Sequence, residues 1–136
     1  MKYAPLALMI FFCGCEPSRP SVDAAMKQYD SLLKTMDAHA IANMFVPDGE
    51  LGNVAKGRDS IEKFLSQFKD VKVLSQQSTS NYLMVDQDTA VQKGNYTQVD
   101  VRGTDTLRIH GEYTGSWLWM RGEGWRIKRM DARATQ

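Results

Sequence analysis

Apolar positions recur at helical spacing soon after an N-terminal apolar run. Between residues 22 and 36 they follow at steps of four, three, four and three, at Val22, Met26, Tyr29, Leu33 and Met36. Ser21 precedes this stripe and can cap the first turn of a helix. The pattern therefore predicts a first helix that buries one face.

Two shorter helices are expected next. Asp37 has the character of an N-cap, and the apolar residues after it share a helical face: Ala40, Ile41, Met44 and Phe45. Residues 47–49, Pro-Asp-Gly, are expected to end this second helix. After an extended piece at 50–55, Asp59 and Glu62 have capping-box spacing for a third helix. Its predicted buried face consists of Ile61, Phe64, Leu65 and Phe68.

From Val71 onward the pattern becomes extended and rich in β-branched and aromatic residues. The predicted strands are VKVLSQQ, NYLMV, TAVQKGNYTQVDV, TLRIHGEYTGSWLWM and GWRIKRM. Turns fall near residues 86–88, 102–105 and 121–124. Three helices followed by antiparallel strands predict an α+β fold, in which the N-terminal helices pack on one face of a strongly curved antiparallel sheet.

Alternation along the strands predicts which side chains face the helices. In TLRIHGEYTGSWLWM one face is apolar: Leu107, Ile109, Gly111, Tyr113, Gly115, Trp117 and Trp119. Its two glycines either leave space or let the sheet bend. In the preceding strand Ala90, Gln92, Gly94 and Tyr96 share a face. In the last strand Trp125, Ile127, Arg129 and Asp131 alternate inward if Trp125 is buried.

Length and charge limit the partners. The chain of 136 residues is expected to form one domain, and its formal net charge is +1. This balance gives no broad basic surface for nucleic acid, so no nucleic-acid partner is expected. His39 and His110 are the only histidines, and no cofactor or metal motif is present in the sequence, so no cofactor and no metal are expected.

The N-terminal run has the pattern of an export signal. Lys2 is followed by apolar residues 3–12, which are too few to span a bilayer. Residues 12–15, Phe-Cys-Gly-Cys, resemble the lipobox of bacterial lipoproteins, with Cys15 as the acylated residue. A metal or redox role for the Cys-x-Cys pair is the alternative, although no further cysteine could complete a thiolate zinc site.

This resemblance divides the chain into a signal peptide at 1–14, a tether at 15–20 and a domain at 21–136. It implies attachment to a membrane through lipid on Cys15. Because Glu16 rather than aspartate follows the cysteine, an outer-membrane position facing the periplasm is expected.

The runs YDSLLKTMDAHAIANMFVPDGEL, KGRDSIEKFL and TGSWLWMRGEGWRI, in this order, resemble the nuclear transport factor 2-like superfamily, and more narrowly its SnoaL-like and ketosteroid-isomerase-like branches. The resemblance implies a cone-shaped fold that encloses a ligand pocket. The expected pocket residues are Tyr29, Asn53, Gln92, Tyr96, Tyr113, Trp117, Arg129 and Asp131. Tyr113 and Trp117 could instead fill the core. Arg129 could bind an anionic ligand or pair with Asp131.

The isomerase mechanism is disfavoured by this comparison. By resemblance Tyr29 falls at the oxyanion tyrosine, Asn53 at the catalytic base and Gly115 near the second oxyanion donor. An amide cannot act as a general base, and glycine offers no proton. Asp131 remains a weak catalytic candidate.

Three hypotheses follow for the domain. The first is an envelope lipoprotein that binds a small, partly apolar ligand or a partner protein without catalysis. The second is an enzyme, a cyclase, isomerase or dehydratase, acting on a hydrophobic small molecule. The third is a dimerisation or assembly module, because many members of the superfamily form homodimers through their sheets.

Overall fold

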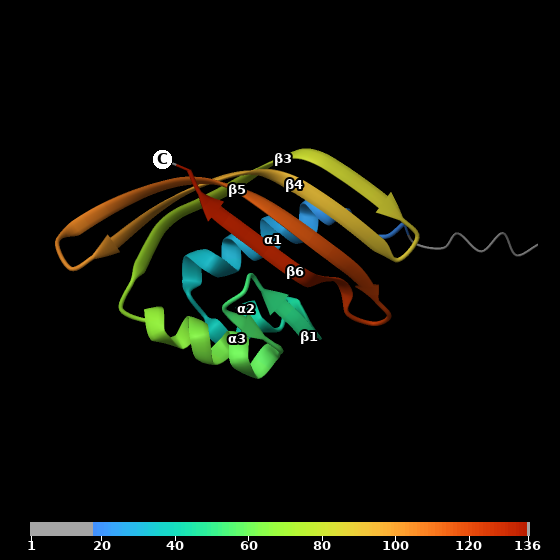
Figure 1. The fold of residues 1–136 in the computed structure, drawn as a ribbon, viewed down its shortest axis with the longest axis horizontal. Helices are drawn as coiled ribbons and strands as arrows, with labels where there is room; N and C mark the ends of the chain where they lie inside the picture. Colours follow the sequence, from blue (N-terminus) through green and yellow to red (C-terminus); the bar gives the residue numbers. More distant parts are fainter. Residues whose placement is uncertain (1–17, 136) are drawn as a thin grey trace, which may run out of the picture.

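Helices precede a long antiparallel sheet in the computed structural model, which describes residues 18–135 (Figure 1). The helices are α1 (Val22–Thr35), α2 (Ala38–Ala42), α3 (Arg58–Leu65) and the short 3-10 helix η1 (Ser66–Phe68). The strands are β1 (Phe45–Leu51), β2 (Ala55–Lys56), β3 (Lys72–Asp86), β4 (Thr89–Arg102), β5 (Asp105–Met120) and β6 (Gly124–Ala134).

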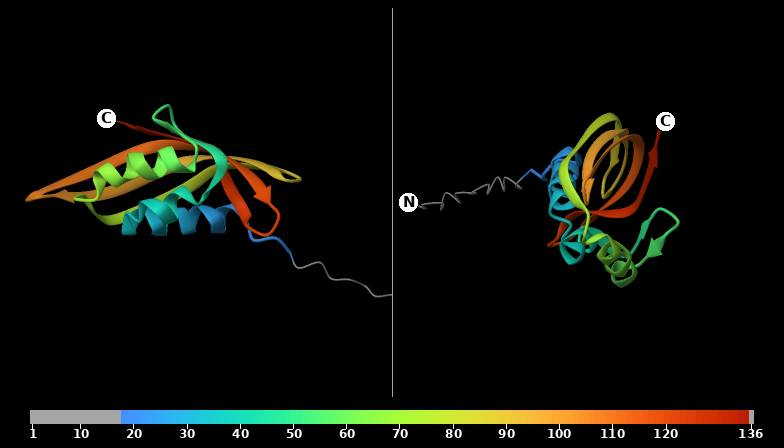
Figure 2. Two further views of the ribbon diagram at one scale, coloured as in Figure 1. Left: turned by 90° about the horizontal axis from the view of Figure 1, so that it is seen from below. Right: turned by 90° about the vertical axis from the view of Figure 1, so that its left-hand side faces the viewer.

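The strands form one six-stranded sheet in the order β2-β1-β6-β5-β4-β3, so β2 and β3 are its edges. β1 is parallel to β6, and the other neighbours are antiparallel. Two perpendicular views show the long strands curling over the helices, which lie on the concave side (Figure 2). The predicted α+β class and curved sheet are confirmed.

Local capping explains where the helices begin. The Ser21 side chain accepts a hydrogen bond from the Ala24 amide at 3.0 Å, and Asp37 accepts one from Ala40 at 3.1 Å, as the sequence predicts. The third helix begins at Arg58, after Gly57 at φ 88°, and no side chain of the described residues caps it. The predicted start at Asp59 is therefore wrong by one residue.

The predicted end of the second helix is also wrong. The helix ends at Ala42, and the chain enters β1, which includes Pro47–Gly49. Phe45 pairs with Ile127 of β6, and the Ile127 amide donates to the Met44 carbonyl at 2.7 Å. Pairing with β6 thus outweighs the helical spacing of these apolar residues, which are buried in either conformation.

One long edge strand replaces two predicted short ones. The segments VKVLSQQ and NYLMV are joined into β3, which pairs with β4 over nearly its whole length. Register shifts between Val73 and Ser75 and between Ser80 and Tyr82 bend this strand. The polar residues between the two segments therefore continue the ladder instead of forming a turn.

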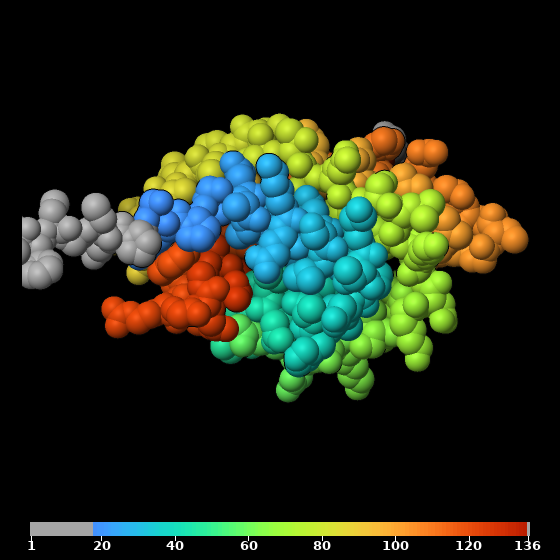
Figure 3. Space-filling model, turned by 180° about the vertical axis from the view of Figure 1, so that it is seen from behind, coloured from blue at the N-terminus to red at the C-terminus, as the bar shows by residue number. Residues whose placement is uncertain are grey.

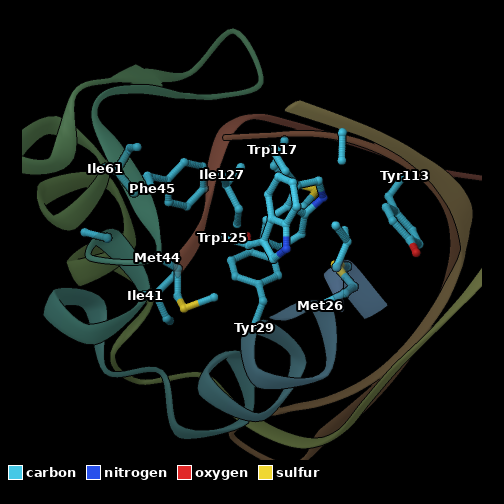
Figure 4. Close-up of a cluster of buried hydrophobic side chains, with 14 of the residues drawn as sticks. Met26, Tyr29, Ile41, Met44, Phe45, Ile61, Tyr113, Trp117, Trp125 and Ile127 are labelled. Atoms are coloured by element: carbon cyan, nitrogen blue, oxygen red, sulfur yellow. The ribbon is translucent and has the colours of Figure 1, made fainter. Parts of the chain in front are cut away.

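The core lies between the concave sheet face and the helices (Figure 4). Its most deeply buried side chains are Trp117, Phe45, Ile41, Ile61 and Ile127. The Tyr29 ring meets the Phe45 ring edge-on, with centroids 6.1 Å apart. The predicted inward faces of β4 and β5 are confirmed from Ala90 to Tyr96 and from Gly111 to Trp117, whereas Leu107 is exposed.

The described chain begins close to the expected tether. The indole nitrogen of Trp125 donates a hydrogen bond to the Pro20 carbonyl at 3.0 Å, so Pro20 is held against the domain. Cys13 and Cys15, on which the lipidation prediction depends, lie outside the described residues. Within residues 18–135, no helix combines the length and the apolar composition that crossing a bilayer requires.

Candidate functional site

An inner cavity of about 190 Å³ lies between α1 and the concave face of the sheet. We use this name for the space bounded by six apolar and five polar residues. These residues are Met26, Leu33, Leu51, Leu65, Met130, Ala132, Tyr29, Gln76, Tyr96, Gln98 and Tyr113. The cavity therefore combines an apolar wall with groups that form hydrogen bonds.

Pairs of small and large residues across β4 and β5 place two of the cavity tyrosines. Gly94 lies opposite Tyr113, and Gly111 lies opposite Tyr96. A Cβ atom at Gly94 would lie 2.8 Å from the Tyr113 ring, and one at Gly111 would lie 2.5 Å from the Tyr96 ring. The space that each glycine leaves is thus taken by the aromatic ring facing it.

Three tyrosines from α1, β4 and β5 contribute hydroxyl groups around the cavity. Burial raises the pKa of Tyr29, Tyr96 and Tyr113. For Tyr113 the pKa reaches about 12, because the negative charge of Asp30 adds to the effect of burial. These hydroxyl groups are neutral at physiological pH, so they can donate and accept hydrogen bonds but do not act as bases.

A buried carboxylate lies behind the polar wall. Asp30 of α1 is 6% exposed. It accepts hydrogen bonds from the Ser78 amide at 3.1 Å, from the Ser78 hydroxyl and from Gln76 Nε2 at 3.3 Å. The other end of that amide, Gln76 Oε1, is buried without a described partner. Asp30 thus fixes the orientation of the glutamine and leaves one acceptor unpaired in the cavity wall.

A second cavity, of about 240 Å³, shares Leu33, Leu65 and Gln98 with the inner cavity. We call it the Asp100 cavity, because Asp100 of β4 lines it and is only 2% exposed. Gln98 donates to the Asp100 carboxylate at 2.7 Å. Within residues 18–135 this is the only side-chain hydrogen bond that Asp100 receives.

Gln92 lies in a third space. It lines a side pocket of about 280 Å³, together with Asp23, Ser78 and Tyr113. The Gln92 amide donates to Asp23 at 2.7 Å, while its Oε1 has no partner among the described residues. The predicted hydrogen bonding of this inward amide is therefore satisfied on the donor side only.

Arg129 and Asp131 do not face the cavity, so their predicted inward position is wrong. Ser116 pairs with Arg129, but the next residue, Trp117, pairs with Ile127. Lys128 is therefore an extra residue on β6, a β-bulge that reverses the alternation. Met130 and Ala132 consequently line the inner cavity in place of Arg129 and Asp131.

On the outer side, Arg129 is held by three partners. Its guanidinium donates to Asp131 at 2.7 and 3.0 Å, to Glu50 at 2.8 Å and to Asn53 at 2.9 Å. Asp131 raises the pKa of Arg129, as Glu50 does to a lesser extent. The alternative that Arg129 forms a salt bridge with Asp131 is thus confirmed. All three guanidinium nitrogens of Arg129 already donate to these partners, so they are not available to hold an anion in two parallel hydrogen bonds.

Asn53 and Asp131 also lie outside the inner cavity. Asn53 belongs to the turn between β1 and β2 beside Arg129. Asp131 borders an open polar groove of about 440 Å³ along β5 and β6, where its charge is paired. Of the predicted pocket residues, Tyr29, Tyr96 and Tyr113 meet at the inner cavity, Gln92 lines the side pocket, and Trp117 lies in the core.

Sequence reasoning missed three buried polar residues: Asp30, Gln76 and Asp100. The alternation that places Tyr96 inward continues to Gln98 and Asp100, so the same rule would have identified Asp100. Asp30 follows Met26 by four positions and lies beside the apolar stripe, which was a weaker signal. Gln76 had no signal, because the register shift after Val73 sets its direction.

Metal ligands do not gather in the described part of the chain. No group of three or more histidine, cysteine, aspartate or glutamate side chains comes together between residues 18 and 135. The inner cavity instead presents hydroxyl and amide groups.

Known structures share this fold. A protein of unknown function from Mycobacterium tuberculosis is 20% identical, with a TM-score of 0.74 over 85% of this chain and 74% of that one. A ketosteroid isomerase-like protein from Erwinia carotovora atroseptica is 14% identical, with a TM-score of 0.73 over 85% and 94%. An NTF2-like protein with a cystatin-like fold from Novosphingobium aromaticivorans is 18% identical, with a TM-score of 0.68 over 83% and 79%.

A search of curated proteins finds no match to this sequence. The family model of the SnoaL-like domain, however, matches residues 18–131, which include all the helices described above and all the strands except the last three residues of β6. The chain therefore belongs to the SnoaL-like domain family, and the solved structures above share its fold.

Proposed function

We propose that this domain binds a small, neutral, partly apolar molecule in the inner cavity without catalysing a reaction. The observation that carries the proposal is Gln76 Oε1, a buried acceptor without a described partner in the wall of a cavity of about 190 Å³. Buried polar groups nearly always have a hydrogen-bond partner. A ligand with one donor group would supply the missing partner and fill the apolar space.

The volume limits the size of this ligand. An apolar cavity of about 150 Å³ accommodates benzene, so about 190 Å³ suits one substituted ring or a short branched chain. A fused four-ring molecule would not fit without rearrangement.

Charge favours a neutral ligand. Within residues 18–135 no lysine, arginine or histidine lines the inner cavity. The Asp30 carboxylate lies directly behind Gln76 and would repel an anion. Arg129, the predicted anion-binding residue, lies on the opposite face of the sheet and is paired.

Binding is favoured over catalysis because the carboxylate behind Gln76 already has three hydrogen bonds. Asp30 accepts two from Ser78 and one from Gln76, so its oxygen atoms are committed to positioning β3. Tyr113, with a pKa of about 12, is not a base at neutral pH. Asp131, the sequence-based catalytic candidate, is outside the cavity and bound to Arg129.

A second candidate function is proton transfer by Asp100. This carboxylate is buried, lines a cavity of about 240 Å³ and receives a single side-chain hydrogen bond among the described residues. A carboxylate in such a setting has a free lone pair for a substrate proton. This supports the enzyme hypothesis with a residue different from the one that the sequence suggested.

Phenol and toluene provide a matched test of the binding proposal, because they have the same shape and differ in one hydroxyl group. Phenol should bind roughly fivefold more tightly, which corresponds to one added hydrogen bond. Gln76→Leu should remove this preference, and Tyr113→Phe should reduce it, because the Tyr113 hydroxyl is also buried without a described partner in the cavity wall. Titration followed by amide chemical shifts would measure both. Equal affinities in the native chain, or no shifts around the inner cavity, would contradict the proposal.

Asp100→Asn separates binding from catalysis. Molecules that co-purify with the chain can be released, identified by mass spectrometry and incubated with fresh protein. Recovery of unchanged material supports simple binding. Conversion by the native chain but not by Asp100→Asn would establish the enzyme alternative instead.

We also propose that Cys15 is acylated and that the domain is attached to the envelope, facing the periplasm on the outer membrane. The support is the lipobox-like Phe-Cys-Gly-Cys at residues 12–15. Cys15→Ser should abolish labelling by a radioactive fatty acid, whereas Cys13→Ser should not. The reverse result would move the attachment site to Cys13.

A further inference from the structure

Exposed apolar side chains gather at one end of the sheet, on the hairpin of β3 and β4. The hairpin patch consists of Tyr82, Leu83, Met84, Val85 and Val91, which are between 38% and 56% exposed. They form five of the eight large apolar residues with high exposure in the described chain. Such a concentration marks an interaction surface.

The patch extends around both faces of an edge strand. Met84 pairs with Val91, and Val85 pairs with Ala90, so alternate residues project to opposite sides of the hairpin. Within residues 18–135, no strand pairs with the other side of β3. The hairpin therefore presents a narrow apolar end rather than a flat face of the kind that two sheets bury against each other.

The N-terminal segment leaves the domain at this same end. Arg19 donates to the Asp88 carboxylate at 2.8 Å and to the Gln87 carbonyl at 3.3 Å, both in the turn between β3 and β4. Its guanidinium also lies 4.6 Å from the centre of a Trp119 ring. Figure 1 and the space-filling view in Figure 3 both show the start of the described chain beside these strands.

We infer that the hairpin patch rests on the surface of a lipid bilayer. The inference depends on the proposed acylation of Cys15, not on ligand binding. Ser18 follows Cys15 by three positions, and these three steps of the chain span at most about 10 Å when fully extended. Because Arg19 is bound to the hairpin turn, a lipid on Cys15 would hold this end of the sheet, and no other, close to the bilayer.

The composition of this end suits the interfacial region of a membrane. Tyr82 and Trp119 combine an apolar ring with a polar atom, which favours the boundary between acyl chains and headgroups. Lys93 lies 5.8 Å from the centre of the Tyr82 ring, and Arg19 neutralises Asp88. The opposite end of the sheet, at the β4–β5 hairpin and the start of β3, carries two exposed large apolar residues, Leu74 and Leu107, against the five of the hairpin patch.

Site-specific fluorescence can test this orientation in the acylated, full-length protein. Residues 13 and 15 are the only cysteines in the sequence. In the mature protein, Cys13 is removed with the signal and the Cys15 thiol is acylated. Met84→Cys therefore introduces a single free thiol. A polarity-sensitive dye at this position is then read in vesicles of phosphatidylethanolamine and phosphatidylglycerol. Leu107→Cys, at 47% exposure on the other hairpin, is the matched control.

Brominated acyl chains should quench the dye at position 84 and leave the dye at position 107 unquenched, while iodide in the water should do the opposite. Adding Leu83→Glu and Val85→Glu should abolish the lipid quenching at position 84. Quenching by lipid at both positions, or at neither, would overturn the inference. So would shielding of position 84 from both quenchers, which would mean that a second copy or another protein covers the patch. Fatty-acid labelling of the same sample reports acylation, and its absence would overturn the inference independently.

Discussion

Gly111 of β5 lies directly opposite Tyr96 of β4, and the Tyr96 ring occupies the space that a side chain at position 111 would need. The carbonyl oxygen of Arg133 on β6 approaches the same point from the other side, 2.5 Å from a Cβ atom at position 111. This glycine therefore serves close packing of three strands around the ring that borders the inner cavity.

Gly111→Ala should destabilise the domain by roughly 1–3 kcal/mol, because the ring and the neighbouring strand must both shift to admit a methyl group. Urea unfolding followed by circular dichroism would measure the loss. Thr114→Ala, on the other face of the same strand, should change stability by no more than about 0.5 kcal/mol. If the two variants unfold at the same urea concentration, the packing at position 111 is looser than described.

Asp30→Ala should cost roughly 2–4 kcal/mol, because it leaves the buried Gln76 amide and the partly buried Ser78 amide without this acceptor. The expected damage is centred on β3 and should appear as faster hydrogen exchange at Ser78. Asp86→Ala provides the control, because Asp86 is an exposed acidic residue on the same hairpin. Equal stability of the two variants would show that Asp30 does not anchor β3 to α1.

Alternation in the sequence was enough to predict the inner faces of β4 and β5, because both strands run without interruption past the cavity. The same rule failed on β6, where one extra residue shifts the alternation, so Met130 and not Arg129 faces the inner cavity. A bulge leaves no reliable mark in a single sequence, since Lys128 suits a regular strand equally well. The cavity tyrosines could thus be predicted, whereas the role of Arg129 could not.

The error at Phe45 has a different cause. Apolar residues that are buried in a helix or in a strand satisfy the same hydrophobic pattern, and only the partner decides between the two. Here the partner is Ile127, more than 80 positions later in the sequence. Local spacing contains no information about such a distant contact.

Stability should fall as the pH rises from 10 to 12, and Tyr113 should be a measurable part of the loss. Burial raises the pKa of Tyr113 from 10.0 to about 12, so the unfolded chain releases this proton first. The stabilising contribution is therefore complete below pH 10 and is lost progressively up to pH 12. Urea unfolding at several pH values in this range should show a shallower slope for Tyr113→Phe than for the native chain.

Arg129→Gln should lower the melting temperature without altering the preference for phenol over toluene, because this arginine lies on the outer face. Its pairs with Glu50 and Asp131 are partly exposed, so the difference from the native chain should shrink at high salt. Arg133→Gln is the control, since Arg133 is an exposed arginine on the same strand. A change in phenol binding for Arg129→Gln alone would place this residue in the ligand site after all.

Deletion of Lys128 tests the bulge directly. Without the extra residue, Ile127 can still pair with Trp117 and Arg129 with Ser116, so β6 becomes a regular strand and keeps its register with β5. Met130 and Ala132 should then still line the inner cavity, and Arg129 should stay on the outer face. The deletion variant should therefore unfold cooperatively, as measured by near-ultraviolet circular dichroism, and should keep the preference for phenol over toluene. Lys128→Ala keeps the residue count and removes only an exposed side chain, so it should unfold like the native chain. Loss of cooperative unfolding in the deletion variant alone would show that the bulge itself, and not the pairing on either side of it, holds Met130 in the cavity wall.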